Sequence, residues 1–314
     1  MKLLASRLAD LLVVLVGVSV ITFLMIRLIP GDAVAIMLGA NTEVTPEKIA
    51  ELRARLGLDQ PLVSQYFQWL GGVLSGDLGV SIWTRRPVSQ EIGAHIRPTV
   101  QLAAMALVFG AGLAVPLGVL MARWRGNRMN ALLQIGTVAG LTIPSFWLGI
   151  MMILLLSAVA PEAQVLGYVP FTEAPLESLK RLALPAFALA LPILANLARL
   201  VRSAMLDALA QDYVRTARAK GVSEASVFFK HALRNALIPF VTSLGIMTGY
   251  LLGGAIVVEQ VFAIPGLGRL VLGAIAERNY PLVQAVVLVV TVTFVGVNFL
   301  VDLLYAAIDP RVRP

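Results

Sequence analysis

The sequence has no cysteine and only two histidines, His95 and His231, among its 314 residues. Without cysteine there is no disulfide, thiolate metal site or thiol nucleophile. No H-E-x-x-H motif occurs, and two isolated histidines argue against a metal centre or a catalytic triad. No glycine is followed directly by lysine, so the phosphate-binding motif G-x-x-x-x-G-K-[ST] is missing as well. These absences predict a chain that is not itself an enzyme and binds no cofactor or metal directly.

Charge is scarce too. Only 14% of the residues are charged, whereas 58% are apolar. That apolar fraction is well above the value for a soluble domain, and the charges gather between the apolar runs rather than within them. The composition therefore predicts an all-α polytopic membrane protein.

Six apolar runs are long enough to cross the bilayer. The first, 11–26, continues to residue 29 and has no small-x-small cleavage site after it, which favours a retained helix over a secretory signal peptide. The other five occupy residues 100–122, 131–160, 182–198, 236–258 and 282–301. Prolines inside these runs indicate helices that bend or unwind where they line a path.

The most plainly interrupted run is 131–160, in which Pro144 is followed by Ser145, Phe146 and Trp147. We predict that these four residues lie at a helix break, where they line a translocation path or simply pack against neighbouring helices. The residues alone favour neither alternative.

Between the first two runs lies a long polar segment, 30–98, which we predict to form a folded extracytoplasmic cap. Residues 62–74 have helical apolar spacing and several aromatic side chains, and residues 76–79 (GDLG) indicate a turn. The sequence thus divides into residues 1–29 (amino terminus and first span), 30–98 (cap segment) and 99–314 (five-helix core).

Basic residues predict the orientation. With the amino terminus inside, the inner segments carry 14 of the 25 basic residues and 6 of the 18 acidic ones, so their net charge is +8 against −1 outside. This bias places both termini in the cytoplasm. The overall charge of +7 then reflects membrane topology, and no nucleic-acid partner is expected.

The most cationic stretch, 212–239, lies between the fourth and fifth runs. Gly221 separates two helix-compatible segments, 213–220 and 223–237, and Ser223 with Glu224 supplies a helix start. Phe228 and Phe229 give the second segment an apolar side. A solvated positive loop would explain the charges, but it would not explain the glycine-punctuated helix pair or the phenylalanines.

The letters YVRTARAKG (213–221) and HALRNALIP (231–239) resemble the cytoplasmic EAA loop of the dipeptide/oligopeptide/nickel branch of ABC-importer permeases. The general loop begins Glu-Ala-Ala, where this chain has Arg215, Thr216 and Ala217. The stretches LIPGD, QYFQWL, GGAIVVEQVFAIPGLGRL and NFLVDLLYAAIDPR resemble the B-type subunit of the same branch, so the resemblance covers nearly the whole chain.

The resemblance implies a type I ABC-importer permease fold in the bacterial inner membrane. It implies a lipid bilayer around the chain, a second homologous permease, two cytoplasmic ATPase subunits that hold ATP-Mg, and an extracytoplasmic binding protein. Cytoplasmic residues 203–236 would then form the ATPase-coupling loop. Its candidate residues are Asp212, Tyr213, Arg215, Thr216, Ala217, Arg218, Lys220, Gly221, Ser223, Phe228, Phe229, His231, Arg234 and Asn235.

Solutes of this branch include short peptides, glutathione-like tripeptides and nickel complexes, and the sequence does not choose among them. A stand-alone secondary carrier is an alternative of another class. It would need a titratable residue at mid-membrane, whereas Asp10, Glu259 and Asp302 all lie near the ends of apolar runs.

Overall fold

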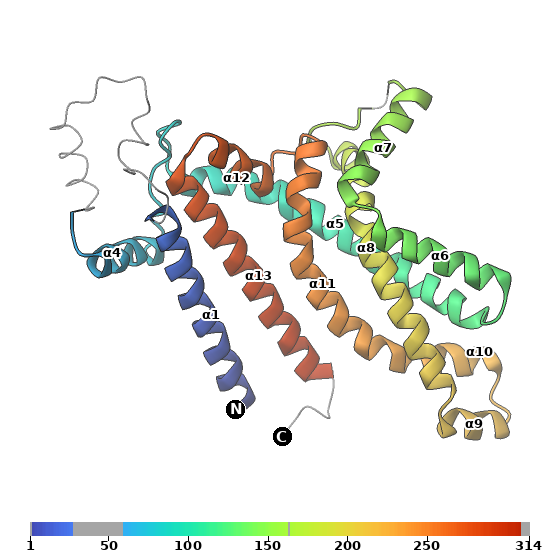
Figure 1. Cartoon of the computed structure of the whole chain (residues 1–314). Coiled ribbons are helices and arrows are strands. Elements are labelled where there is room, and N and C mark those ends of the chain that lie inside the picture. The colour runs from blue at the N-terminus through green and yellow to red at the C-terminus, as the bar shows by residue number, and fades with distance from the viewer. Residues whose placement is uncertain (1, 28–58, 163, 309–314) are drawn as a thin grey trace. The chain divides into compact units, whose positions relative to one another are not determined.

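The structure is a computed structural model that describes residues 2–27, 59–162 and 164–308. In these ranges the chain is helical, and its only extended pairing is an isolated bridge between Val80 and Pro87. The helices, shown in Figure 1, are α1 (Lys2–Arg27), α4 (Leu62–Leu74), α5 (Val88–Arg123), α6 (Arg128–Thr142), α7 (Ser145–Val159), α8 (Pro175–Leu209), α9 (Asp212–Ala219), α10 (Glu224–Ser226), the π-helix η1 (Val227–Ala232), α11 (Leu233–Val261), α12 (Leu267–Ala276) and α13 (Tyr280–Ile308).

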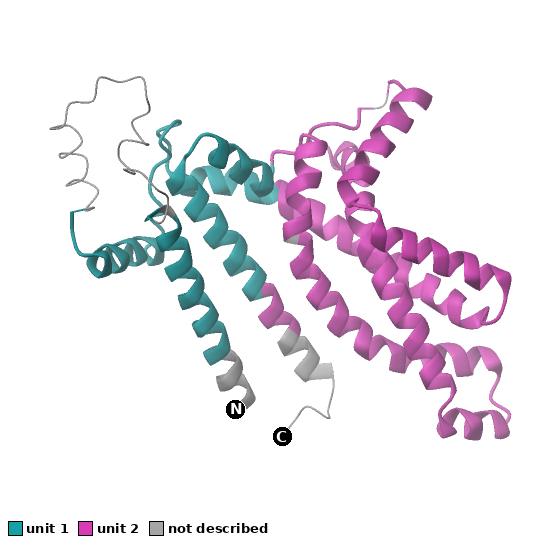
Figure 2. Ribbon diagram, viewed as in Figure 1, with its two compact units in different colours: residues 1–97, 266–296 teal, residues 98–265, 297–314 magenta. Residues whose placement is uncertain are grey.

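The chain divides into two compact units, coloured separately in Figure 2: residues 1–97 with 266–296, and residues 98–265 with 297–314. Of the segment expected to form a cap, residues 30–58 lie outside the described residues, and the three-part division expected from the sequence stays a prediction.

In the first unit, α4 lies against α1. The hydroxyls of Ser19 and Tyr66 share a hydrogen bond of 2.7 Å, and the rings of Phe23 and Tyr66 meet edge to face at 5.3 Å. Arg27 Nε donates to Gln65 Oε1 at 3.0 Å. The helix predicted over 62–74 is therefore confirmed, and two of its aromatic side chains, Tyr66 and Trp69, pack against Phe23 of α1.

The turn that follows α4 is attached to the corner before α13. Asn279 Nδ2 donates to Ser81 Oγ at 2.8 Å, and Trp83 Nε1 donates to the Glu277 carbonyl at 2.8 Å. Arg85 and Arg278 both have positive φ, at 56° and 55°. These side-chain bonds hold two sharp turns together that are nearly 200 residues apart in the sequence.

The second unit is built around α8, which packs against α5, α6, α7 and α11. Its core side contains many small residues, among them Ala186, Ala190 and Ala198, which let neighbouring helices come close. The tightest approach to α5 is at Gly118. A Cβ added there would lie 2.6 Å from Val201 Cβ and 2.7 Å from the Ala198 carbonyl oxygen.

Among the residues that the structure describes, three helices are long and apolar enough to cross a membrane: residues 88–123, 175–209 and 280–301. The expected third span is instead a pair, α6 and α7, bent by 105°. Each has 15 residues, about 22 Å at 1.5 Å per residue, which is less than the ~30 Å hydrocarbon layer. If this pair and a second bent pair, 224–251 and 253–261 (52°), each count as one span, the described residues contain five candidate spans. The apolar part of α1, Ala9–Met25, is shorter than the usual span.

The break predicted at Pro144 is confirmed. Ile143 is extended (ψ 121°) and Pro144 caps α7, as expected because proline disfavours the helical conformation of the residue before it. Elsewhere the helix does not unwind at proline, because Pro116, Pro185 and Pro239 lie inside continuous helices. Bending at these prolines stays a prediction. Such prolines are tolerated where side chains and neighbouring helices satisfy the freed backbone groups.

Candidate functional site

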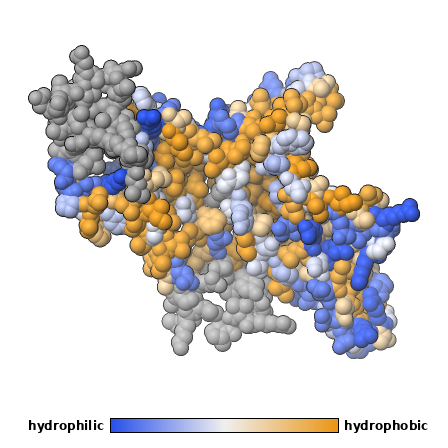
Figure 3. Space-filling model, in the orientation of Figure 1, coloured by the Kyte–Doolittle hydropathy of each residue, from blue (hydrophilic) through white to orange (hydrophobic). Residues whose placement is uncertain are grey.

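The cationic loop is two short helices that follow the end of α8. The first, α9, matches the predicted helix within one residue at each end. The second differs from the prediction: α10 passes through the π-helix η1 directly into α11, so no boundary separates the loop from the apolar run that follows it. Figure 3 shows hydrophilic side chains gathered around α9 and α10, beside the mainly hydrophobic surface of the longer helices.

Gly221 makes the turn between the two helices. Its φ is +79°, a conformation that side chains with a Cβ rarely adopt. The Gly221 amide donates to the Arg218 carbonyl at 2.9 Å and the Val222 amide to the Ala217 carbonyl at 3.1 Å, the two bonds of a Schellman motif. No atom of the described residues lies within 4 Å of an added Cβ, so among them glycine is needed for its backbone conformation and not for space.

Side chains on both flanks reinforce the turn. Ser223 Oγ accepts from the Ser226 amide at 3.4 Å, which confirms the predicted N-cap. Arg218 donates to both oxygens of Glu224, at 2.7 and 3.1 Å. This hydrogen bond is the main cause that lowers the pKa of Glu224 and raises that of Arg218, although both side chains are exposed to solvent.

Buried apolar side chains anchor the loop. Val214 of α9, with Val227 and Ala232 of η1, is completely buried. The two phenylalanines diverge: Phe228 packs against the core of the second unit, whereas 57% of Phe229 is exposed. Tyr213 is also exposed, and its hydroxyl accepts a hydrogen bond from Asn235 Nδ2 at 3.0 Å. The loop therefore presents Phe229 and Tyr213 outward on a closed framework.

The other predicted loop residues lie around this framework. Arg215 pairs with Asp212 at 3.2 Å, and both side chains are largely in solvent. His231 is half-buried, and its carbonyl accepts a second bond from Asn235 Nδ2 at 2.8 Å. Ala217 is half-buried, while the side chains of Thr216, Lys220 and Arg234 are exposed.

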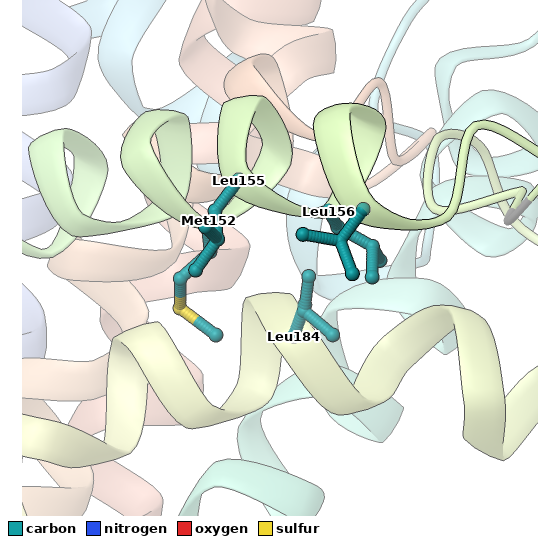
Figure 4. Close-up of a pocket in the computed structure, with 5 residues that line it drawn as sticks. Met152, Leu155, Leu156 and Leu184 are labelled. Atoms are coloured by element: carbon teal, nitrogen blue, oxygen red, sulfur yellow. The ribbon is translucent and has the colours of Figure 1, made fainter.

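The four candidate path residues gather at the α6–α7 break. Pro144 is the cap, Ser145 is half-buried, and Phe146 and Trp147 are exposed on the first turn of α7. Farther along α7, Met152, Leu155, Leu156 and Val159 form with Leu184 of α8 an apolar pocket of about 320 Å³ (Figure 4). Phe146, Trp147 and this pocket give α7 an apolar surface, and whether the four candidate residues line a path stays a prediction.

One polar surface was missed from the sequence. Asn196, Arg199 and Ser203 lie at spacings of three and four residues on α8 and share an exposed face. Across from them, Gln134 of α6 lines the same cavity of about 440 Å³. The spacing was a readable signal, but Arg199 was counted with the inner loop because it follows the end of an uncharged run.

Residues 114–314 match the family described as "Binding-protein-dependent transport system inner membrane component", and residues 1–102 match its amino-terminal region. The chain belongs to this family. It is a membrane permease subunit, a transport component that is not itself catalytic.

Among similar sequences, the chain is 42% identical to the "Putative peptide transport system permease protein" of Brucella abortus (strain 2308), over 99% of this chain and 98% of the relative. It is 40% identical to the glutathione transport system permease protein GsiC of Escherichia coli O6:H1, over 98% and 97%. A solved structure of the MetNI methionine ABC transporter in an inward-facing conformation matches 70% of this chain and 97% of its own, with 18% identity and a TM-score of 0.58. This likeness shows the type I ABC-importer permease fold.

Proposed function

We propose that the permease is one transmembrane subunit of an ATP-driven importer that moves a small peptide-like solute inward by alternating access. Two relatives with over 95% mutual coverage carry peptide and glutathione transport in their names, which supports a peptidic solute. A nickel complex or another small solute is the alternative within this class. A stand-alone secondary carrier is the alternative of another class.

The observation that carries the proposal is the shape of the loop at residues 203–236. A Schellman turn, an N-cap and an ion pair close α9 onto α10, while Phe229 and Tyr213 point outward. An exposed aromatic ring on a rigid, cationic helix pair is suited to a groove in a partner. Because α10 continues through η1 into α11, a push on the loop would reach a membrane helix through continuous helical backbone.

The partners follow from what the chain lacks. Its sequence contains no phosphate-binding loop, so two separate cytoplasmic ATPase subunits would hold ATP-Mg. A second homologous permease would complete the path, and an extracytoplasmic binding protein would deliver the solute, in keeping with the family description.

We also propose six membrane crossings with both termini in the cytoplasm. This count takes α1 as a span and each bent pair as one crossing, and it places the polar segment 30–98 outside. Reporter fusions test it: one after Pro314 should report cytoplasm and one near Gly79 the outside, as the basic-residue bias of the short loops predicts. The opposite pattern would refute the six-span arrangement, and a single inverted result would mean one miscounted crossing.

The decisive experiment is reconstitution of the whole transporter in proteoliposomes. Uptake of a radiolabelled dipeptide or tripeptide should require both ATP and the binding protein, and the purified permease alone should hydrolyse no ATP. Uptake by the isolated permease driven by a pH gradient would overturn the importer assignment in favour of the secondary carrier.

A further inference from the structure

A polar face of α8 lies at the end of the apolar run 182–198. The helix buries most of its residues in the core of the second unit, yet Asn196, Arg199 and Ser203 form an exposed stripe. Arg199 directly follows the apolar run 182–198 and precedes the end of α8 at Leu209 by ten residues. At this end of the run, amide and guanidinium groups face water or a protein partner rather than lipid.

The stripe opens onto the cavity between α6 and α8. The cavity measures about 440 Å³ and is lined by Gln134, Leu141, Asn196, Arg199, Leu200, Arg202 and Ser203. It contains two guanidinium groups and no carboxylate. Among the described residues, neither Arg199 nor Arg202 forms an ion pair with an aspartate or glutamate. The cavity is therefore an unneutralised cationic site.

One donor in this cavity has no acceptor. Arg202 Nε is buried and makes no hydrogen bond with any described residue. Asn130 Oδ1 is another such buried atom, and it lies on α6, the helix that packs against α8. Leaving a buried polar atom unpaired costs free energy, more so when the group is charged, and native structures rarely tolerate it without an external partner. The Arg202 guanidinium therefore keeps unsatisfied hydrogen-bonding capacity beside the cavity that the residue lines.

We propose that this cavity binds the carboxylate of the transported solute on its way through the permease, with Arg202 and Arg199 as donors. The proposal rests on the proposed function and names a binding site for its solute. Arginine presents a planar fork of N–H groups that suits a carboxylate. The amides of Gln134 and Asn196 provide the donors and acceptors that a peptide bond needs. A lipid phosphate would use the arginines but not this row of amides, so the observations favour a peptidic carboxylate.

The test uses the complete transporter in proteoliposomes at a saturating concentration of binding protein. The variants are Arg199→Gln, Arg202→Gln and Arg202→Lys, with Arg128→Gln as the matched control, since Arg128 is an exposed arginine outside the cavity. Three quantities are measured for each: co-purification of the partner subunits, ATP hydrolysis stimulated by the binding protein, and the initial rate of dipeptide uptake. Arg199→Gln changes an exposed side chain and keeps the test valid if Arg202→Gln fails to fold.

For both Arg→Gln variants we expect uptake to be about tenfold lower, because each removes one charge-assisted hydrogen bond to the solute. Assembly and stimulated ATP hydrolysis should stay normal. Arg202→Lys, which keeps the charge without the fork, should recover part of the uptake, and Arg128→Gln should behave as wild type. Unchanged uptake in both Arg→Gln variants would overturn the proposal, as would a parallel loss of assembly. Absence of ATP-dependent uptake by the wild type would instead refute the proposed function.

A second arm separates the solute from a lipid. The same uptake is measured in vesicles of phosphatidylcholine alone and with phosphatidylglycerol added. A solute site predicts that the defect of Arg199→Gln is equal in both vesicle types. If wild-type uptake required phosphatidylglycerol and the variant had lost that requirement, the cavity would be a lipid-phosphate site and the proposal would be wrong.

Discussion

Asn235 Nδ2 donates a hydrogen bond of 3.0 Å to the hydroxyl of Tyr213, across 22 residues of sequence. The bond joins the first turn of α9 to the first turn of α11, so it closes the loop across its base. Both side chains are exposed, which makes the bond a modest contribution to stability but a direct constraint on the orientation of α9.

This bond predicts a small, non-additive effect. Tyr213→Phe removes the acceptor and keeps the ring, and Asn235→Ala removes the donor. Each variant should loosen α9, with a coupling free energy between them of about 0.5–1 kcal/mol in a double-mutant cycle. Hydrogen exchange of the α9 amides provides the measurement. Fully additive effects of the two substitutions would show that the bond does not constrain the loop.

Substitutions at Gly221 separate backbone strain from partner contact. Gly221→Ala should cost about 1 kcal/mol because φ is positive, and Gly221→Asn should cost less because asparagine tolerates that region. No atom of the described residues lies within 4 Å of a Cβ added at Gly221. Gly221→Leu should therefore be no less stable than Gly221→Ala in the isolated permease.

In the assembled transporter, however, Gly221→Leu should lose ATPase co-purification and uptake while its membrane abundance stays normal. The extra loss relative to Gly221→Ala reports a partner surface close to the turn. Intact transport in Gly221→Leu would show that the helix pair is only a solvated connector.

The two phenylalanines should give opposite results. Phe229→Ala removes an exposed ring, so the thermal stability of the purified permease should be unchanged while ATPase co-purification falls. Phe228→Ala removes a ring packed on the core, which should cost about 2 kcal/mol of unfolding free energy. The reverse assignment, with association lost only in Phe228→Ala, would contradict the outward-facing role of Phe229.

The ion pair between Arg218 and Glu224 sets the pH response of the loop. Because the pKa of Glu224 is lowered from its ordinary value of 4.5, the pair is fully present above that value and is lost as the pH falls through the lower pKa in the folded chain. ATPase association should thus not change with the ionisation of this carboxylate near neutral pH, where the carboxylate stays charged. Association measured in Glu224→Gln should be slightly weaker at neutral pH and converge with wild type in acid. A difference that grew as the pH fell would contradict this sign.

Gly118 and Gly112 form a matched pair on α5. Gly118→Ala would force a methyl group against Val201 and the Ala198 backbone, and should cost about 2 kcal/mol in the unfolding of the purified permease. Gly112 has no atom within 4 Å of its added Cβ, so Gly112→Ala should be neutral or should stabilise the helix by up to about 1 kcal/mol. Equal effects of the two substitutions would mean that α5 and α8 do not pack as closely as described.

Much of this permease was readable from local pattern. The apolar runs, the helix over 62–74, the break at Pro144 and the Gly221–Ser223 turn depend on residues only a few positions apart. Helix capping, the Schellman bonds and the conformational restriction before proline act within one helical turn. A short stretch of sequence is therefore enough to predict these local features. The lack of a phosphate-binding motif could also be read from the sequence, because the residues of that motif are contiguous.

Only the tertiary structure decided which side chains each element turns inward. Phe228 and Phe229 are adjacent and chemically identical, and their roles separate only because η1 packs one of them on the core. The continuity of α10 with α11, the contact of Gly118 with Val201 and the cavity around Arg202 likewise depend on helices brought together from distant parts of the sequence. Close packing of small residues and the direction of a side chain are set by such neighbours, and the local sequence carries no record of them.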